Sequence, residues 1–155
     1  CAQPDLNLGW SNNFQYKNWN LDLFFTGVFG QDIYNATAEQ YSNVSFVKEG
    51  RNVLKSVATE HRATDTQSQA PSNRWIENGS YFRLSSVSLG YTFGKIGNWI
   101  NSFKLYATCN NVFTITGYSG RDPEINLGGL EPGMDRRTNY YPRTRSFMIG
   151  LNVNF

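Results

Sequence analysis

Few side chains in this 155-residue chain could carry covalent or metal chemistry. The single histidine, His61, lies in a polar stretch without a cysteine or glutamate at ligand spacing, so it fits a solvated loop better than a metal site. Four carboxylates offer the oxygen ligands that Ca²⁺ prefers. They are Asp122, Glu124, Glu131 and Asp135. Because their spacing differs from the alternate-residue pattern of a calcium loop, we expect no catalytic site, no metal site and no cofactor.

Aromatic and arginine side chains in the connecting segments are better candidates for binding than for catalysis. Flat rings can stack on sugar faces or peptide groups, and a guanidinium group can form paired hydrogen bonds with acidic groups. The candidates for ligand binding are Trp75, Tyr118, Arg121, Tyr140 and Tyr141. Contact of these side chains with neighbouring loops or with a covering partner is the alternative, and both interpretations stay open here.

Composition leaves two classes of β-protein. Charged residues make up 17% of the chain, the net charge is +2, and no basic run suggests a nucleic-acid partner. The mean hydropathy is -0.50, and no stretch approaches the ~18 consecutive apolar residues of a membrane-spanning helix. Aromatic residues nevertheless reach 15%. A soluble β-sandwich and an outer-membrane β-barrel, whose strands hide apolar residues by alternation, both fit this composition.

Five stretches alternate apolar and polar residues with the period of a β-strand. They cover approximately Leu6–Tyr16, Trp19–Phe29, Phe82–Phe93, Phe103–Ile115 and Arg145–Phe155. Each runs for roughly 10 to 13 residues, whereas globular strands have about 5 or 6 and tilted transmembrane strands about 9 to 11. The length therefore favours the membrane barrel. The alternation slips between Leu84 and Val87, which predicts a β-bulge near Ser85–Ser86.

The connections between these stretches alternate in length. A tight turn near Lys17–Asn18 is followed by a long segment from about Gln31 to Gly79. A short connection from Gly94 to Asn101 is followed by a long one from Gly117 to Pro142. Short periplasmic turns and long extracellular loops are typical of outer-membrane barrels.

Aromatic residues of the apolar parity support the same orientation. With the C-terminus assigned to the periplasm, six of them gather near the periplasmic edge: Tyr16, Trp19, Tyr91, Phe93, Phe103 and Phe155. Amphipathic rings prefer the headgroup layer, so we interpret this set as an aromatic girdle. The other parity carries polar residues, including Asp22 and Lys104, and is expected to face a lumen. Arg143 and Arg145 lie near the outer rim, where contact with lipopolysaccharide phosphates and simple solvation are both open hypotheses.

Five strands cannot close a barrel by themselves. Backbone groups cannot stay unpaired in hydrocarbon, and single-chain barrels begin at about 8 strands. Several chains could share one barrel, or the chain could be the C-terminal piece of a longer protein. The abrupt start, without a signal peptide or a plug, favours the second hypothesis.

Four ordered motifs carry a family resemblance. "FQYKNWNLDLFFTGVFGQDIYN" (Phe14–Asn35) and "RWIENGSYFRLSSVSLGYTFGK" (Arg74–Lys95) come first. "LYATCNNVFTITGYSGRDPE" (Leu105–Glu124) and the ending "YPRTRSFMIGLNVNF" (Tyr141–Phe155) follow. Together they resemble the SusC/RagA family, which are TonB-dependent outer-membrane transporters of Bacteroidetes. The chain departs from the family in lacking the plug and the TonB-contacting segment, and no family motif can be placed in residues 37–70.

The resemblance implies an all-β fold. The chain would be an antiparallel transmembrane β-barrel segment, about five C-terminal strands of a barrel of roughly 22 strands, with long extracellular loops. Residues 1–155 would form the C-terminal part of the receptor barrel. The last strand would carry the barrel-assembly signal, made of Phe147, Ile149, Leu151, Val153 and Phe155.

The resemblance also implies a function and partners. The whole protein would import large nutrients, glycans or oligopeptides, across the bacterial outer membrane without catalysing covalent chemistry. A SusD-like surface lipoprotein, the TonB complex, the barrel-assembly machinery and outer-membrane lipid or lipopolysaccharide would be its partners. Two alternatives are a soluble secreted β-sandwich binding module and an oligomeric barrel to which each chain contributes five strands.

Overall fold

The chain folds into two compact units that each combine distant segments of the sequence. The computed structural model describes residues 1–42, 45–53, 55, 72–95, 99–124, 133–135 and 141–154. The loop unit comprises Cys1–Asp5, Phe29–Ser80 and Gly117–Pro142. The sheet unit comprises Leu6–Val28, Tyr81–Thr116 and Arg143–Phe155.

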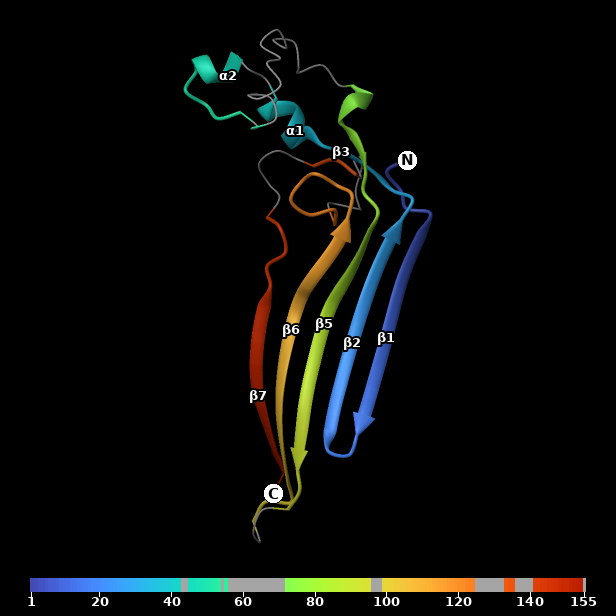
Figure 1. The fold of residues 1–155 in the computed structure, drawn as a ribbon, viewed down its shortest axis with the longest axis vertical. Helices are drawn as coiled ribbons and strands as arrows, with labels where there is room; N and C mark the ends of the chain where they lie inside the picture. The colour runs from blue at the N-terminus through green and yellow to red at the C-terminus, as the bar shows by residue number, and fades with distance from the viewer. Residues whose placement is uncertain are drawn as a thin grey trace. The chain divides into compact units, whose positions relative to one another are not determined.

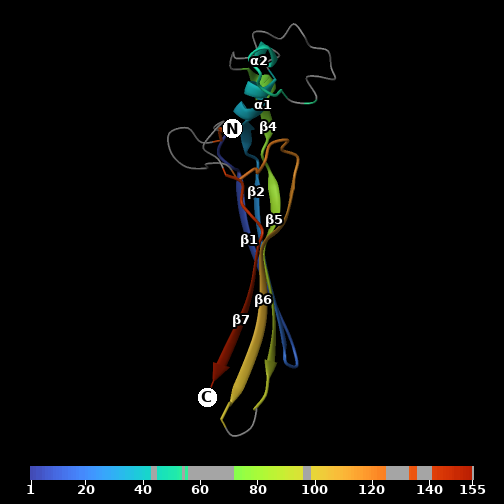
Figure 2. The same ribbon diagram turned by 90° about the vertical axis from the view of Figure 1, so that its left-hand side faces the viewer.

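One antiparallel sheet with the strand order β1-β2-β5-β6-β7 dominates the sheet unit (Figure 1). Its strands are β1 (Leu6–Tyr16), β2 (Trp19–Phe29), β5 (Tyr81–Phe93), β6 (Ser102–Thr116) and β7 (Ser146–Asn154). They run for 9 to 15 residues and lie in a single layer when the sheet is viewed from the side (Figure 2). The five predicted strands are thus confirmed, and the sheet formed by the described residues does not close on itself.

Two local irregularities of the sheet fall where the sequence predicts them. The turn between β1 and β2 contains Lys17, whose φ of 52° is in the left-handed region. The β2–β5 register skips Ser85, because Phe24 pairs with Ser86 and Phe25 pairs with Leu84. The predicted bulge is therefore confirmed.

A second bulge was not predicted. The β5–β6 register jumps from the Ser86–Asn110 pair to the Leu84–Phe113 pair, and the φ of Asn111 is 53°. Two residues of β6, Asn111 and Val112, thus oppose Ser85 alone. Apolar residues keep odd positions of β6 on both sides of the bulge, with Cys109 before it and Phe113 after it, so the sequence pattern does not indicate this bulge.

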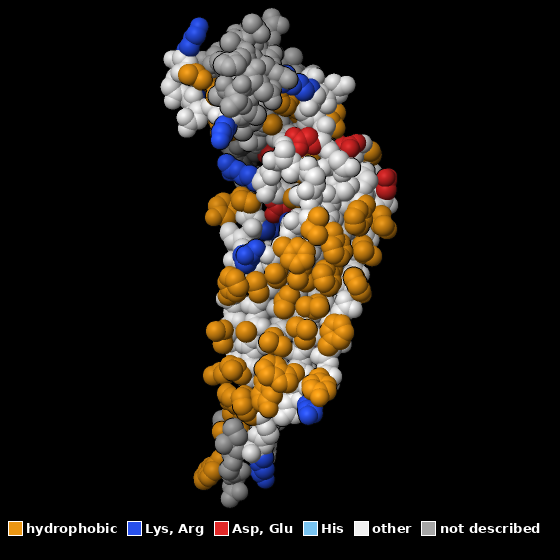
Figure 3. All heavy atoms as spheres, in the orientation of Figure 1, with side chains coloured by type: hydrophobic (Ala, Val, Ile, Leu, Met, Phe, Trp, Pro, Cys, Tyr) orange, Lys and Arg blue, Asp and Glu red, His pale blue; other side chains and the backbone are white. Residues whose placement is uncertain are grey.

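The two faces of the sheet differ in chemistry. One face carries large apolar side chains that remain 38% to 80% exposed, as the space-filling view shows (Figure 3). They include Leu6, Trp10, Phe14, Trp19, Leu89, Leu105, Phe113, Phe147, Ile149, Leu151 and Val153. Side-chain hydrogen bonds join neighbouring strands across the opposite parity. These bonds link Asn13 to Asp22, Thr26 to Ser85, Ser88 to Thr108, Arg83 to Thr114 and Asn110 to Ser146.

Aromatic side chains form a connected row at one end of the apolar face. The Trp19 and Tyr91 ring centroids are 4.8 Å apart, and those of Tyr91 and Phe93 are 4.6 Å apart. Phe93 continues the row to Phe103 at 5.3 Å. Rings at these distances and inclined to one another attract beyond their buried area. Four of the six residues of the predicted aromatic girdle are thus in direct contact; Phe155 lies outside the described residues.

The loop unit contains short elements within the long connection that the sequence left undivided. They are β3 (Asp32–Tyr34), α1 (Ala36–Tyr41), α2 (Ser45–Lys48), a 3₁₀ helix η1 (Asn73–Trp75) and β4 (Ile76–Asn78). Strands β3 and β4 pair in a separate antiparallel sheet. Asn35 caps α1, because its side-chain oxygen accepts the Ala38 N–H at 2.8 Å. None of the helices in the described ranges is long and apolar enough to cross a membrane.

Candidate functional site

Three segments of the loop unit meet at one carboxylate. Glu77, on β4, accepts the Asn35 amide at 2.9 Å and the Ser119 hydroxyl at 2.8 Å through Oε1. Its Oε2 accepts the Ser119 backbone N–H at 2.8 Å. Asn35 is only 2% exposed and is held from both sides, because its Oδ1 caps α1 while its Nδ2 reaches Glu77. The network therefore fixes the segment after β3 against the segment after β6.

A second contact fixes the Asp135 side chain. The Tyr118 ring packs on Ile33 in the small buried core, and its hydroxyl donates to Asp135 Oδ2 at 3.1 Å. The Asp135 backbone N–H donates to the Tyr34 carbonyl at 3.0 Å. Asp135 is 7% exposed, so both its backbone and its carboxylate are held in place before any ligand arrives.

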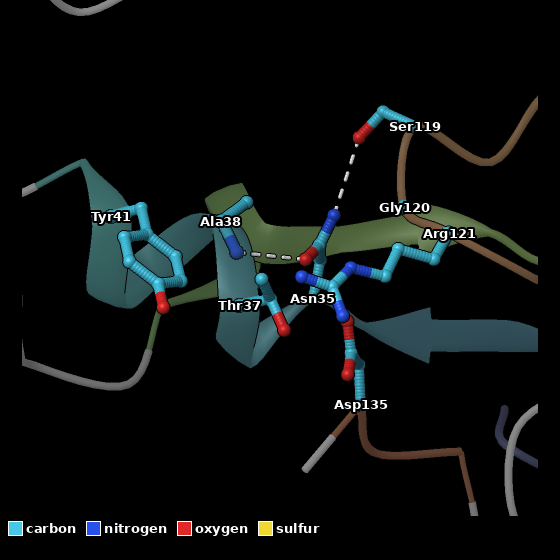
Figure 4. A pocket seen from close by; sticks show the side chains of 8 residues that line it. All are labelled: Asn35, Thr37, Ala38, Tyr41, Ser119, Gly120, Arg121 and Asp135. Carbon is cyan, nitrogen blue, oxygen red and sulfur yellow. Dashed lines mark hydrogen bonds between the residues drawn. The ribbon is translucent and has the colours of Figure 1, made fainter. Parts of the chain in front are cut away.

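These fixed groups border a cavity of about 480 Å³ (Figure 4). Its lining residues are Asn35, Thr37, Ala38, Tyr41, Ser119, Gly120, Arg121 and Asp135. They come from α1 and its cap, from the turn after β6, and from the segment around residue 134. Figure 4 shows the Arg121 side chain extending toward Asn35 and Asp135, while Tyr41 lies at the other end of the lining. A cavity of this size is in the range of about 300–1,000 Å³ that is usual for small-molecule sites.

The aromatic and arginine residues predicted to bind ligand have different surroundings. Trp75 and Tyr118 are 9% and 6% exposed, so their rings are covered by the loop unit itself. Arg121 is exposed and lines the cavity, and Tyr141 is 81% exposed without lining it. Tyr140 lies outside the described residues. The structure therefore brings Arg121, alone among the described members of this set, to the cavity.

The carboxylates considered for calcium have structural partners. The Asp122 side chain accepts the Glu124 backbone N–H at 3.0 Å, which closes a turn around Pro123, and the Asp135 carboxylate accepts a hydrogen bond from the Tyr118 hydroxyl. Within the described residues, no group of three or more His, Cys, Asp or Glu side chains could hold a metal ion. Glu131 and His61 lie outside this part of the chain.

The arginines near the ends of the strands also have defined contacts. Arg83, 2% exposed, donates to the Thr114 hydroxyl at 2.8 Å and lies over the Tyr81 ring. Arg145 donates to the Asn111 carbonyl at 3.4 Å and to the Val112 carbonyl. It thus satisfies the carbonyls that the β6 bulge displaces from the strand ladder.

Sequence reasoning missed several residues of the cavity. Asn35, Thr37 and Tyr41 were assigned only to a long loop, although an asparagine directly before Ala36–Tyr41 is a helix-capping signal. Asp135 was considered only as a calcium ligand. No local signal connects these residues with Arg121, since their contact depends on segments about 80 to 100 positions apart.

The sequence of the chain is similar to those of TonB-dependent receptors. It is 30% identical to TonB-dependent receptor P3 of Formosa agariphila, over 98% of this chain and 16% of that receptor. It is 28% identical to TonB-dependent receptor SusC of Bacteroides thetaiotaomicron, over 97% of this chain and 15% of that receptor. The chain therefore spans about a sixth of the length of these curated relatives. No family model matches it.

The fold is also that of part of a solved transporter. The structure of the RagAB peptide transporter matches 99% of this chain with a TM-score of 0.73 and 22% identity, over 17% of that chain. The RagAB peptide importer in its closed-closed state matches 99% of this chain with a TM-score of 0.71 and 21% identity, over 18% of that chain. The solved structures show the fold, and the sequence similarity bears out the resemblance expected from the motifs: over nearly its whole length the chain is similar to a stretch of TonB-dependent receptors that include SusC.

Proposed function

We propose that residues 1–155 form the C-terminal part of the barrel of a transporter that imports glycans or oligopeptides across a bacterial outer membrane. The observation that carries this proposal is a chain-long similarity to TonB-dependent receptors combined with a sheet that is apolar on one face and polar on the other. Exposed apolar side chains in such number are stable against lipid and unfavourable against water. The protein would move its substrate without covalent chemistry.

The proposed partners follow from this role. A SusD-like lipoprotein would cover the extracellular side, the TonB complex would supply energy through a segment outside this chain, and lipid would cover the apolar face. The barrel-assembly machinery would engage the last strand, whose Phe147, Ile149, Leu151 and Val153 are all exposed on one parity. In this arrangement Arg121 and Tyr141 would be the exposed ligand-binding candidates of the original set, and Arg143 and Arg145 would lie at the level of lipopolysaccharide phosphates.

A soluble β-sandwich is not favoured as an alternative. Such a module needs a second sheet packed over the apolar face. The sheet unit, over its described residues, is a single layer whose apolar side chains stay exposed.

The test uses the complete gene that encodes this chain, expressed in a Bacteroidetes host with a C-terminal tag. We expect the protein in the outer-membrane fraction, and purification in mild detergent should recover a surface lipoprotein with it. Deletion of the gene should abolish growth on a glycan or on a peptide digest as sole carbon source, and deletion of the TonB gene should give the same defect. Recovery in the soluble fraction, or growth independent of TonB, would contradict the proposal.

A further inference from the structure

We propose that the apolar face of the sheet binds one phospholipid with a net negative headgroup, whose acyl chain lies in a groove around Ala107. The proposal rests on the proposed function, which puts this face in lipid, and it deepens that function by naming the lipid and its place on the sheet. The site combines the groove, the aromatic rings beside it and two lysines at the same end of the sheet, all within the sheet unit. In the proposed orientation this end lies in the periplasmic leaflet.

The groove is formed by one small side chain between larger ones. Ala107 on β6 pairs with Leu89 on β5 and with Ile149 on β7, and all three lie on the apolar parity. Together with Leu105 they line a groove of about 490 Å³. Leu89 and Leu105 are 44% and 41% exposed and Ile149 is 80% exposed, so no described part of the chain covers the groove. A methyl group between three larger apolar side chains leaves a furrow that a flexible alkyl chain can fill.

Aromatic rings border the groove on the side of the β1–β2 turn. Trp19, Tyr91 and Phe93 of the aromatic row are part of its lining. Among the described residues, no acceptor takes a hydrogen bond from the Trp19 indole N–H or from the Tyr91 hydroxyl. Tryptophan and tyrosine rings occupy the boundary between acyl chains and headgroups, because one part of each ring system is apolar and the other is polar. The headgroup would therefore lie on the turn side of the row and the acyl chain on the groove side.

Two lysines lie at this end of the sheet. The Nζ of Lys17, in the β1–β2 turn, is 5.4 Å from the centroid of the Tyr16 ring, which belongs to the apolar parity. Lys95 is exposed and follows the last residue of β5 by two positions. No described carboxylate forms an ion pair with either lysine. Figure 3 shows basic side chains at this lower end of the face, and none of the acidic side chains that it draws lies there, so a phosphate group at this level would meet uncompensated positive charge.

The charges of the sheet unit distinguish between classes of headgroup. The unit carries one acidic side chain, Asp22, and its basic residues are Lys17, Arg83, Lys95, Lys104, Arg143 and Arg145. The Asp22 carboxylate accepts a hydrogen bond from the Asn13 amide on the polar parity, so it does not face the lipid. A zwitterionic headgroup would bring an ammonium group that the two lysines repel and that no acidic side chain on the apolar face accepts. A phosphate headgroup without an ammonium group avoids this repulsion, so a net negative phospholipid is favoured.

The test uses the full-length transporter reconstituted in phosphatidylcholine vesicles, and it identifies lipid contacts by photo-crosslinking and mass spectrometry. Two otherwise identical preparations contain a trace of a probe with a diazirine on its acyl chain, phosphatidylglycerol in one and phosphatidylethanolamine in the other. We expect labelling of Leu89 and Ile149 to be stronger with phosphatidylglycerol by roughly tenfold or more. K17Q and K95Q should each lower this ratio roughly fivefold, which is the contribution of one lysine beside an anionic headgroup, and the double variant should bring the ratio close to one.

Two matched controls separate charge from position and volume from place. Lys104 lies at the same end of the sheet, but its side chain crosses Gly90 on the polar parity, where a Cβ atom would lie 3.6 Å from its Nζ. K104Q should therefore leave the ratio unchanged. A107F should fill the groove and weaken the labelling of both groove residues by both probes. L151F enlarges a side chain on the same face outside the groove lining, so it should leave the labelling unchanged.

Several results would overturn the proposal. Equal labelling by the two probes is one, and an equal loss of the lipid preference in K17Q and K104Q is another. Lack of labelling by either probe would show that protein covers the groove, and displacement of the probe by lipopolysaccharide but not by unlabelled phosphatidylglycerol would assign the groove to lipopolysaccharide. A wild-type transporter that supports TonB-dependent growth but shows no lipid preference would remove the lipid site and leave the transport function intact, so failure of the site and failure of the proposed function are distinguishable.

Discussion

At the scale of single residues, the side chains around position 79 leave room for a glycine only, whereas the backbone conformation there does not demand one. A Cβ atom at this position would lie 2.4 Å from Cδ1 of Ile33 and 3.2 Å from Cγ of Gln31. Both side chains are 1% exposed, so neither can move away without disturbing the loop unit. Overpacking of this kind costs about 1–3 kcal/mol.

We therefore expect Gly79→Ala to loosen the pairing of the loop unit around β3 and β4. The Gly79 N–H donates to the Gln31 carbonyl at 2.8 Å, and the Gln31 side chain donates back to the Gly79 carbonyl at 2.7 Å. Hydrogen exchange of amides in residues 31–35 and 76–80 should accelerate by roughly fivefold or more, as an opening energy lower by about 1 kcal/mol requires. Gly117→Ala is the control, because a Cβ atom there meets nothing within 4 Å. Equal exchange in both variants would show that the close approach at Gly79 is relieved at no cost.

At the scale of elements, hydrogen bonds join the β6 bulge to the segment that begins β7. The Asn111 side chain donates to the Thr144 carbonyl at 2.8 Å, and Arg145 donates to the carbonyls of Asn111 and Val112. These reciprocal bonds lie one residue beyond the Asn110–Ser146 pair, the last of the β6–β7 register. They therefore fix the register of β7 at its first residue, where a slip would exchange its apolar and polar faces.

Replacement of Arg145 should weaken the beginning of β7 more than loss of one surface charge would. We expect Arg145→Gln to accelerate hydrogen exchange at the first residues of β7 by roughly fivefold, because a charge-assisted bond to exposed carbonyls is worth about 1 kcal/mol or slightly more. Arg145→Lys is the control, because it keeps the positive charge but lacks the guanidinium group that reaches both carbonyls. If Arg143→Gln and Arg145→Gln instead both release lipopolysaccharide during purification and leave exchange unchanged, the phosphate-binding hypothesis holds for these two arginines.

The sequence predicted long elements well and short ones poorly. Alternation over ten or more residues is a local signal, so the five strands and the slip at Ser85 could be found without the structure. Strands β3 and β4 have three residues each and pair across about 40 positions, so neither carries a periodic signal. For the same reason Trp75 and Tyr118 could be placed in loops but not assigned to the buried or exposed side of them. The burial of these side chains depends on contacts between distant segments, such as that of Tyr118 with Ile33, and no local sequence signal predicts such a contact.

At the scale of the whole molecule, we expect the apolar face of the sheet to contact lipid and the polar face to contact water. Neighbouring positions on β7 test it directly, because Leu151 lies on the apolar parity, pairing with Leu105, and Asn152 lies on the polar parity, pairing with Lys104. Both positions are exposed in the chain by itself, so burial within this chain cannot hide either one. Any difference in their reactivity must come from what surrounds the sheet.

We expect opposite labelling of single cysteines at these two positions in the full-length protein, in a background where Cys1 and Cys109 are replaced by serine and alanine. In outer-membrane vesicles opened by sonication, Asn152→Cys should react with a charged maleimide, whereas Leu151→Cys should react mainly with a lipid-soluble one, because a charged reagent cannot enter hydrocarbon. The reagents act as controls for each other, since a misfolded chain would expose both cysteines to the charged maleimide. A second sheet packed over the apolar face would protect Leu151→Cys from both reagents. That result would show that protein, and not lipid, covers this face.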